Sequence, residues 1–281
     1  MNNLTNYHSH TSFCDGKAPM EAFIAEAVRQ GFTSYGVSSH APLPFRTRWT
    51  IDDREQTGLY LQEFARLKRL YGDRIELYVG LEIDYMDEDQ QPANDYFQSL
   101  PLDYRIGSVH LIESRGKYVD IDTDAETFAE NLRLHFGDDL RKLVTDYFDK
   151  LMRMVSTGGF DFVGHADKIV YNASRCQPDI AEQPWYRQKI REYFETIARH
   201  GAMVEINTKK YHAGAGGVFF PNRSHFRLLR ELRIPVLVNS DAHLPQTIDS
   251  GRREALAALQ EAGIDTVMQL TGGRWQPTKI D

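Results

Sequence analysis

"NYHSHTSFCDGKAPMEAFIAEAVRQGFTSYGVSSH", residues 6–40, sets the pattern that the rest of the chain repeats. It predicts a short strand at 6–10, an amphipathic helix that ends at Gly31, and a second strand at 33–40. Histidines lie at the ends of both strands, and Asp15 follows the first strand. This stretch therefore predicts a strand–helix–strand unit with metal-ligand side chains at its strand ends.

The same alternation continues along the chain. Further strands are predicted at 75–86, 104–112, 160–165, 202–207 and 234–243. Further helices are predicted at 52–71, 124–134, 138–157, 182–200, 224–233 and 252–262, and a last short apolar run covers 265–270. Seven strands that alternate with helices predict an α/β fold, either a parallel sheet or a closed β/α barrel. Because no linker composition interrupts the pattern, we expect a single domain over residues 1–281.

Composition narrows the classes of function. The 281 residues carry a formal net charge of −7, which argues against a broad surface for nucleic-acid backbones. The two cysteines, Cys14 and Cys176, are too few for a disulfide framework. The sequence has neither the pattern of a signal peptide nor an apolar run of about 18 residues, so we expect a cytoplasmic protein without a membrane partner.

Nine side chains of metal-ligand type follow the predicted strands. They are His8, His10, Asp15, His40, Glu82, His110, His165, Asp241 and His243. A single histidine at a strand end is usually a structural residue, but the carboxyl ends of parallel strands meet on one face, so nine ligands there favour a metal site. Imidazole and carboxylate together suit Zn²⁺, Mn²⁺ or Fe²⁺. Because nine ligands exceed what one ion takes, we expect three divalent metal ions.

Six motifs, "HSH…D", "SSH", "GLEID", "GSVH", "GHAD" and "NSDAH", occur in the order typical of the polymerase-and-histidinol-phosphatase (PHP) superfamily, which the chain resembles from His8 to His243. "HAPLPF", "GLEIDYM" and "DYRIGSVH" are most similar to the monofunctional histidinol-phosphate phosphatases. The resemblance implies a distorted (β/α)7 barrel and a phosphomonoesterase of histidine biosynthesis. Such an enzyme hydrolyses L-histidinol phosphate to L-histidinol and phosphate by attack of a metal hydroxide on phosphorus.

The resemblance also implies how the ligands are shared. The three implied groups are His8, His10, Glu82 and Asp241; Glu82, His110 and His165; and Asp15, His40 and His243. Asp15, Asp241 and His243 are the implied catalytic residues. Many histidinol-phosphate phosphatases have a histidine near position 15, whereas this chain has Asp15, as in the wider superfamily.

Candidate substrate-binding residues lie at or beyond the carboxyl ends of the fifth and sixth strands. They are Lys168, Arg175, Asn207, Lys209 and Lys210. Each of the four cationic side chains is suited to bind a phosphate oxygen. An ordinary role as a solvated surface residue is about equally compatible with each. Asn207 and Glu205 share one side of their strand, where either suits a substrate amine or hydroxyl. The glycine-rich loop within 208–224 is a candidate flap over the site.

Three alternatives remain open at this stage. The chain can be a PHP phosphoesterase acting on another small phosphate ester, a nucleotide or an oligonucleotide. An amidohydrolase also begins with His-x-His, but it needs a bridging lysine or an eighth strand that ends in aspartate. A non-catalytic metal-binding module is the third possibility, and such modules commonly lack several of the nine ligands.

Overall fold

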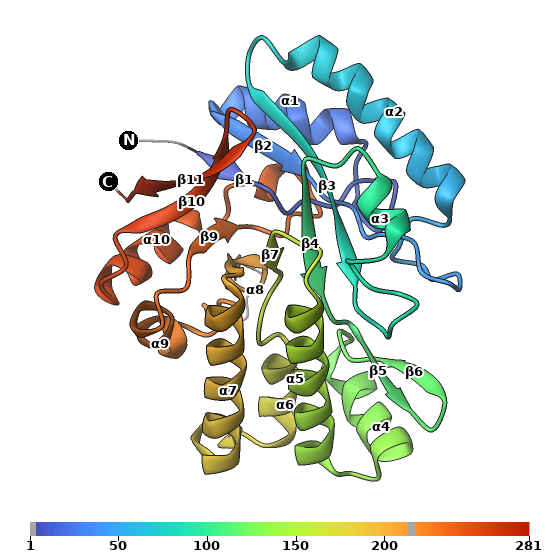
Figure 1. Cartoon of the computed structure of the whole chain (residues 1–281), viewed down its shortest axis with the longest axis vertical. Helices are drawn as coiled ribbons and strands as arrows, with labels where there is room; N and C mark the ends of the chain where they lie inside the picture. Colours follow the sequence, from blue (N-terminus) through green and yellow to red (C-terminus); the bar gives the residue numbers. More distant parts are fainter. Residues whose placement is uncertain (1–3, 213–216, 281) are drawn as a thin grey trace.

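The computed structural model describes residues 4–212 and 217–280. Parallel strands form its centre in chain order (Figure 1): β1 (Thr5–Asn6), β2 (Ser34–Val37), β3 (Glu76–Asp84), β4 (Tyr104–Ser108), β7 (Phe162–Val163), β8 (Met203–Asn207) and β9 (Val236–Asn239). A parallel bridge joins Ser9 to Ala242, and His10 N–H donates to Ala242 O (2.8 Å). The sheet therefore closes almost completely, and the predicted distorted (β/α)7 barrel is confirmed.

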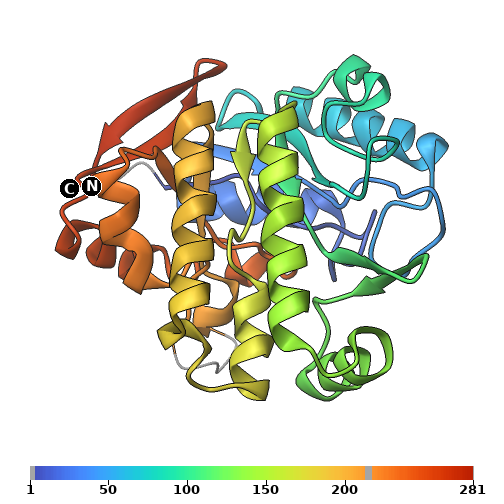
Figure 2. The same cartoon turned by 60° about the horizontal axis from the view of Figure 1, so that its bottom comes forward.

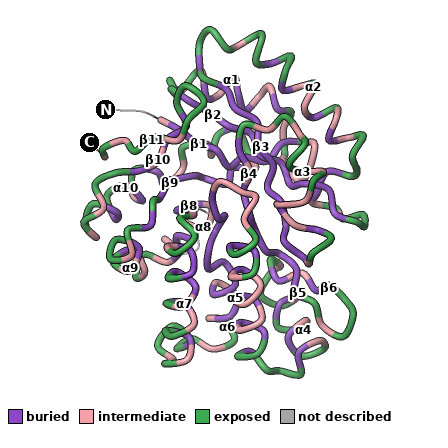
Figure 3. The backbone as a smooth tube through the Cα atoms, in the orientation of Figure 1, coloured by how far each residue is buried: buried purple, intermediate pink, exposed green. Residues whose placement is uncertain are grey.

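Helices pack around this barrel, and their bounds are α1 (Met20–Gln30), α2 (Arg54–Tyr71), α3 (Asp95–Ser99), α4 (Ala125–Phe136), α5 (Leu140–Thr157), α6 (Ile169–Cys176), α7 (Pro184–His200), α8 (Lys209–His212), α9 (Phe226–Glu231) and α10 (Arg252–Glu261). Helices α5 and α7 run side by side (Figure 2). Burial follows the layers, with purple strands at the centre and green outer helix faces (Figure 3). Across the described ranges, no helix combines the length and apolar composition that a membrane span requires.

Helix α5 shows how the local sequence produces these layers. The Asp139 side chain accepts the N–H of Lys142 (2.8 Å) and so caps the first turn. Leu143, Tyr147 and Leu151 recur every four residues and are buried. Each such side chain stabilises the fold by about 1.5–3 kcal/mol. The spacing therefore fixes which face of α5 turns toward the barrel.

The predicted strand at 104–112 is wrong at its carboxyl end. Strand β4 ends at Ser108, and the following residues form an antiparallel hairpin of β5 (Leu111–Ser114) and β6 (Lys117–Asp120). Arg115 and Gly116 have φ angles of 52° and 75°, which are typical of the two-residue turns that favour hairpins. The chain after β4 therefore pairs with itself and leaves the barrel.

A second hairpin, β10 (Thr266–Thr271) and β11 (Arg274–Lys279), covers the amino end of the barrel. Leu270 N–H donates to the Tyr7 hydroxyl (2.8 Å), and Leu270 O accepts from Ser34 Oγ (2.8 Å). Trp275 Nε1 donates to Asp161 Oδ1 just before β7 (2.9 Å). Because this hairpin lies at the amino ends of the strands, the carboxyl ends remain available for a site.

The predicted loop at 208–224 has structure at both of its described ends. Helix α8 begins it, and the 3₁₀ turn Arg223–His225 ends it. Asn207 and Phe220 form an antiparallel bridge, and Asn222 N–H donates to Asp167 Oδ2 (2.9 Å). Residues 213–216, at the centre of the candidate flap, lie outside the described residues, so the flap stays a prediction.

Candidate metal centre

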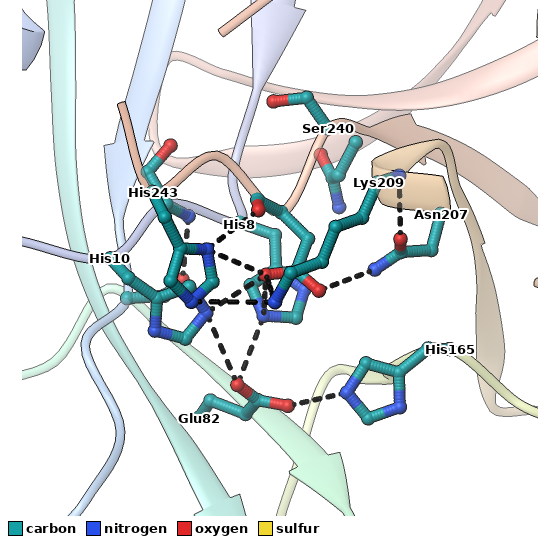
Figure 4. Close-up of polar contacts among 12 residues, drawn as sticks. His8, His10, Glu82, His165, Asn207, Lys209, Ser240 and His243 are labelled. Atoms are coloured by element: carbon teal, nitrogen blue, oxygen red, sulfur yellow. Dashed lines mark hydrogen bonds and ion pairs between the residues drawn. The ribbon is translucent and has the colours of Figure 1, made fainter. Parts of the chain in front are cut away.

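The nine predicted ligands come together at the carboxyl ends of the barrel strands; Figure 4 shows His8, His10, Glu82, His165 and His243. Glu82 belongs to β3, Asp15 lies in the loop before α1, and the other seven follow the ends of β1, β2, β4, β7 and β9. Seven of the nine side chains are buried. Asp15 and His243 are exceptions, with side chains 26% and 17% exposed. These two residues mark the side of the cluster that faces solvent.

Glu82 is the centre of the cluster. Its two carboxylate oxygens lie within 3.5 Å of a nitrogen in each of five rings: His8 (3.0 Å), His10 (3.4 Å), His40 (3.1 Å), His110 (3.5 Å) and His165 (2.8 Å). The first three rings surround Oε2, and the last two surround Oε1. One carboxylate with a different set of imidazoles at each oxygen is suited to bridge two ions.

Asp241 extends the cluster toward solvent. Its Oδ1 lies 3.1 Å from His10 Nε2 and 3.5 Å from His243 Nδ1. His243 Nε2 in turn lies 3.1 Å from Asp15 Oδ2. The contacts therefore run from the buried Glu82 side to the partly exposed Asp15.

Ligand atoms gather into three overlapping groups, each within 4.8 Å: His10, Asp15, His40 and His243; His8, His10 and Glu82; and His40, Glu82 and His110. The first contains the implied group of Asp15, His40 and His243 and adds His10. In the implied group of Glu82, His110 and His165, the Nε2 atoms of the two histidines lie 3.2 Å apart. The geometry thus shares His10 and His40 between groups, which the sequence motifs did not indicate.

The donor set fits divalent cations. Four buried nitrogen or oxygen atoms of the nine residues make no hydrogen bond: one is His165 Nδ1, and the other three are His10 Nε2, Asp15 Oδ1 and His40 Nδ1. Buried polar atoms without a partner cost free energy, and functional sites are where they are retained. Because the last three atoms belong to the first group, a cation there would satisfy them together.

Two ligands have a strained backbone. His165 and Asp241 have φ angles of 28° and 49°, in the region that side chains other than glycine rarely adopt. Such strain costs about 1–3 kcal/mol and persists at functional sites. A Cβ on the neighbouring Gly164 would lie 2.6 Å from Ser108 Oγ and 3.0 Å from Ile106 Cγ2, so glycine lets this turn pack closely against β4.

Two further carboxylates hold the histidines in place. Glu205 Oε1 lies 2.7 Å from His8 Nδ1, and Glu205 Oε2 accepts the N–H of His165 (2.9 Å). Asp84 Oδ1 lies 3.0 Å from His110 Nδ1. Such carboxylates fix the tautomer of a ligating imidazole and make its other nitrogen a better ligand. Sequence reasoning gave Glu205 a possible substrate contact and did not single out Asp84, although both share a strand face with the site.

Replacing Glu205 by Gln is expected to weaken metal binding by about 10- to 100-fold. The amide lacks the negative charge that orients His8, and its NH₂ cannot accept from Asn239 Nδ2, which now donates to Glu205 Oε1 (2.9 Å). Competition with a chelator measures the affinity, and circular dichroism checks the fold. Glu261→Gln, at an exposed pair with Arg223, is the control. Equal affinities in all three proteins would contradict this role.

The histidines differ in protonation. Burial would lower the pKa of His110, but Asp84 and Glu82 raise it to about 9. Burial likewise opposes the shift of His8, whose pKa is held well above its usual value by Glu205 and Glu82. Burial, with His243 nearby, lowers the pKa of His10 to about 4. Near neutral pH, His10 is therefore a neutral ligand, whereas His8 and His110 each carry an extra proton.

Metal affinity is therefore expected to rise with pH between about 6.5 and 8.5. An ion that binds His8 or His110 displaces a proton, and each displaced proton adds about one log unit of affinity per pH unit. Chelator competition at several pH values measures the slope. In Asp84→Asn the carboxylate that does most to raise the pKa of His110 is gone. The slope of log metal affinity against pH is therefore expected to fall by about one proton. A slope that is flat, or the same in both proteins, would contradict these protonation states.

The structure separates the four candidate cations. Lys209 Nζ lies 3.2 Å from Asp241 Oδ1 and 3.3 Å from His243 Nε2. Lys168 is buried three residues after His165. Arg175 and Lys210 instead lie over the ring of Tyr171, at 3.7 and 4.9 Å from its centroid. Lys168 and Lys209 therefore remain the candidates next to the ligands, and the structure does not bring Arg175 or Lys210 to them.

Asn207 lies at the centre but its amide is already engaged (Figure 4). Its Nδ2 donates to Glu205 Oε2 (2.9 Å) and Asp241 Oδ2 (3.2 Å), and its Oδ1 accepts the N–H of Lys209 (3.0 Å). These bonds connect one ligand, one supporting carboxylate and one candidate cation. Asn207 is thus placed to orient the residues around it.

The chain is similar to known proteins over most of its length. A histidinol-phosphatase from Bacillus subtilis is 26% identical over 84% of this chain and 92% of its own length. A probable histidinol-phosphatase from Schizosaccharomyces pombe is 27% identical over 95% of this chain and 89% of its own. The structure of a Lactococcus lactis histidinol phosphate phosphatase, complexed with Zn, L-histidinol and phosphate, matches with a TM-score of 0.72 at 18% identity, over 98% of this chain and 99% of that one. The model of the PHP domain family matches residues 6–209, about three quarters of the sequence, and the chain belongs to that family.

Proposed function

We propose that the protein is a metal-dependent phosphomonoesterase that hydrolyses L-histidinol phosphate to L-histidinol and phosphate. The observation that carries the proposal is the cluster at the carboxyl end of the barrel, where five imidazoles surround the carboxylate of Glu82. Support for the substrate comes from the curated relatives, which bear the name histidinol-phosphatase and match most of the chain. The route to histidine is the pathway that such a reaction serves.

Three divalent ions, of Zn, Mn or Fe, are the proposed cofactors, held by the nine ligands that the sequence nominates. Bound there, they would supply Lewis-acid stabilisation of the phosphate and a water of lowered pKa. Imidazole nitrogens and carboxylate oxygens are the ligands that these metals accept. Three overlapping groups of ligand atoms within 4.8 Å, which contain seven of the nine residues, support the count.

The side chains around the cluster have distinct proposed roles in hydrolysis of the phosphate ester. The oxygen of a water attacks phosphorus, the P–O bond to the alcohol breaks, and the leaving alkoxide takes up a proton. Asp15, Asp241 and His243 are the proposed catalytic residues, because Asp15 and His243 are on the partly exposed side of the cluster, where a water and a phosphate can enter, and the buried Asp241 lies 3.5 Å from His243. Lys209 and Lys168 are proposed to offset the charge of the phosphate oxygens.

Phosphate release by the metal-loaded protein tests the proposal. L-Histidinol phosphate is compared with sugar phosphates, nucleotides and a thymidine oligonucleotide, with chelated enzyme as the blank. We expect a kcat/KM above about 10⁴ M⁻¹s⁻¹ on L-histidinol phosphate and values at least about 100-fold lower on the others. A preference for a nucleotide or oligonucleotide would reject the substrate and keep the phosphoesterase.

A further inference from the structure

A carboxylate, Asp122, lies beside the metal centre on a firmly held segment that follows β6. Ile121 N–H donates to the carbonyl of His110, one of the nine ligands (3.0 Å). On the other side, Asn172 Nδ2 donates to Thr123 O (2.8 Å). These two bonds hold the backbone on both sides of Asp122 in place, so the carboxylate starts from a fixed point of the chain.

Asp122 forms an ion pair with the buried Lys168. Lys168 Nζ lies 2.5 Å from Asp122 Oδ2, and the two side chains are 7% and 33% exposed. Burial would raise the pKa of Asp122, but Lys168 and Lys209 hold it below its usual range. Burial would lower the pKa of Lys168, but Asp122 and Asp241 raise it above its usual value. Both groups are therefore charged at neutral pH, with the carboxylate on the solvent side.

A fixed negative charge at this place is unfavourable for a phosphate ester alone. The carboxylate repels a dianion, and its pairing with Lys168 weakens the cation that would otherwise attract the phosphate. Among the described residues, none donates a hydrogen bond to Asp122 Oδ1. That oxygen therefore has capacity for a donor from outside the protein.

We propose that Asp122 binds a cationic group of the substrate and that the site thereby selects phosphate esters of amino alcohols. This inference rests on the proposed function and narrows the substrate class, because it says that the enzyme recognises the amine of the ester as well as its phosphate. A charge-assisted hydrogen bond from an ammonium group to a carboxylate is about twice as strong as a neutral one. A sugar phosphate offers no such group.

An aromatic side chain borders the same entrance. The partly exposed indole of Trp49 meets the rings of His40 and His110 edge to face, at 4.8 and 5.4 Å between centroids. His110 is also the residue whose carbonyl holds the segment of Asp122. The indole contacts His110, and the segment of Asp122 is bonded to the same residue, so the two suit a substrate that carries both an amine and a flat ring. L-Histidinol phosphate has both.

The test compares two esters that differ only in the amine: L-histidinol phosphate and 3-(imidazol-4-yl)propyl phosphate. The kcat/KM of each is measured for the metal-loaded wild type, for Asp122→Asn and for Glu126→Gln. Asparagine keeps an oxygen for Lys168 and loses only the charge. Glu126, an exposed carboxylate in the first turn of α4, gives a control with the same change in net charge.

We expect the wild type and Glu126→Gln to prefer the amine-bearing ester, and the preference to fall by about 10- to 100-fold in Asp122→Asn. Inhibition by the product L-histidinol should weaken more than inhibition by inorganic phosphate. A preference that is unchanged in Asp122→Asn, with both esters slowed equally, would overturn the proposal, because Asp122 would then act only through Lys168.

Failure of the proposed function would give a different result. A wild type that hydrolyses both esters equally keeps the phosphatase but overturns selection by charge. A wild type that hydrolyses neither ester rejects the proposed substrate. In that case the ratio of kcat/KM for O-phosphoethanolamine to kcat/KM for ethyl phosphate decides the role of Asp122. A preference for the amine-bearing ester that Asp122→Asn abolishes supports the proposal, and equal rates for the two esters overturn it.

Discussion

Replacing Glu82 by Gln is expected to abolish metal binding at the two groups of ligand atoms that contain Glu82. Turnover of L-histidinol phosphate is expected to fall by about 10³-fold or more, equivalent to about 4 kcal/mol of transition-state stabilisation. The reason is the position of the carboxylate, whose two oxygens face five imidazoles. Burial alone would raise the pKa of Glu82, but His40, His8 and His110 hold it well below its usual value, so it is ionised. An amide has neither the charge nor a second acceptor oxygen.

Metal content and phosphate release, measured on the same preparation, check this prediction. Glu88→Gln, an exposed carboxylate just beyond β3, is the matched control and should behave as wild type. Circular dichroism separates loss of metal from loss of fold. Full metal content and full turnover in a folded Glu82→Gln protein would contradict the proposed centre.

Replacing Lys209 by Met is expected to lower kcat/KM by about 10²- to 10³-fold, the usual loss when one group that stabilises transition-state charge is removed. Its ammonium is 3.2 Å from Asp241 Oδ1, at the side of the cluster where Asp15 and His243 are partly exposed. A phosphate bound to the ligands there would lie within reach of this cation. Methionine keeps much of the length of the side chain and removes only the charge.

The neighbouring lysine provides the control. Lys210 lies over the ring of Tyr171, so Lys210→Met should change kcat/KM by no more than about twofold. Steady-state kinetics of the two variants side by side makes the comparison. Equal losses in both, or no loss in Lys209→Met, would contradict the separation of these cations that the structure indicates.

The barrel and the identity of the ligands could be predicted because both depend on local patterns. Apolar strands and amphipathic helices alternate with clear boundaries such as Gly31, whose φ angle is 80°. The carboxyl ends of parallel strands meet whatever the details of packing, so a list of polar residues after each strand was enough to assemble the cluster.

Side-chain direction and partner choice could not be predicted in the same way. Glu205 and Asn207 share a strand face, but only the fold shows that Glu205 holds His8 and that Asn207 holds Lys209. Lys209 and Lys210 are adjacent in sequence and differ only in where their side chains lie. The apolar pattern does not predict the β5–β6 hairpin, because a strand that ends at 108 and one that ends at 112 have the same pattern. The positive φ angles of Arg115 and Gly116, which distinguish the two, belong to the folded chain.

The most direct test of the central claim is stepwise reconstitution. The protein is stripped with a chelator and reloaded with Zn²⁺ or Mn²⁺, and bound ions per chain and phosphate release from L-histidinol phosphate are measured on the same samples. We predict no turnover in the stripped protein and full turnover, with a kcat/KM above about 10⁴ M⁻¹s⁻¹, when three ions are bound. Full turnover in the stripped protein, or no phosphate release from the fully loaded one, would contradict the account.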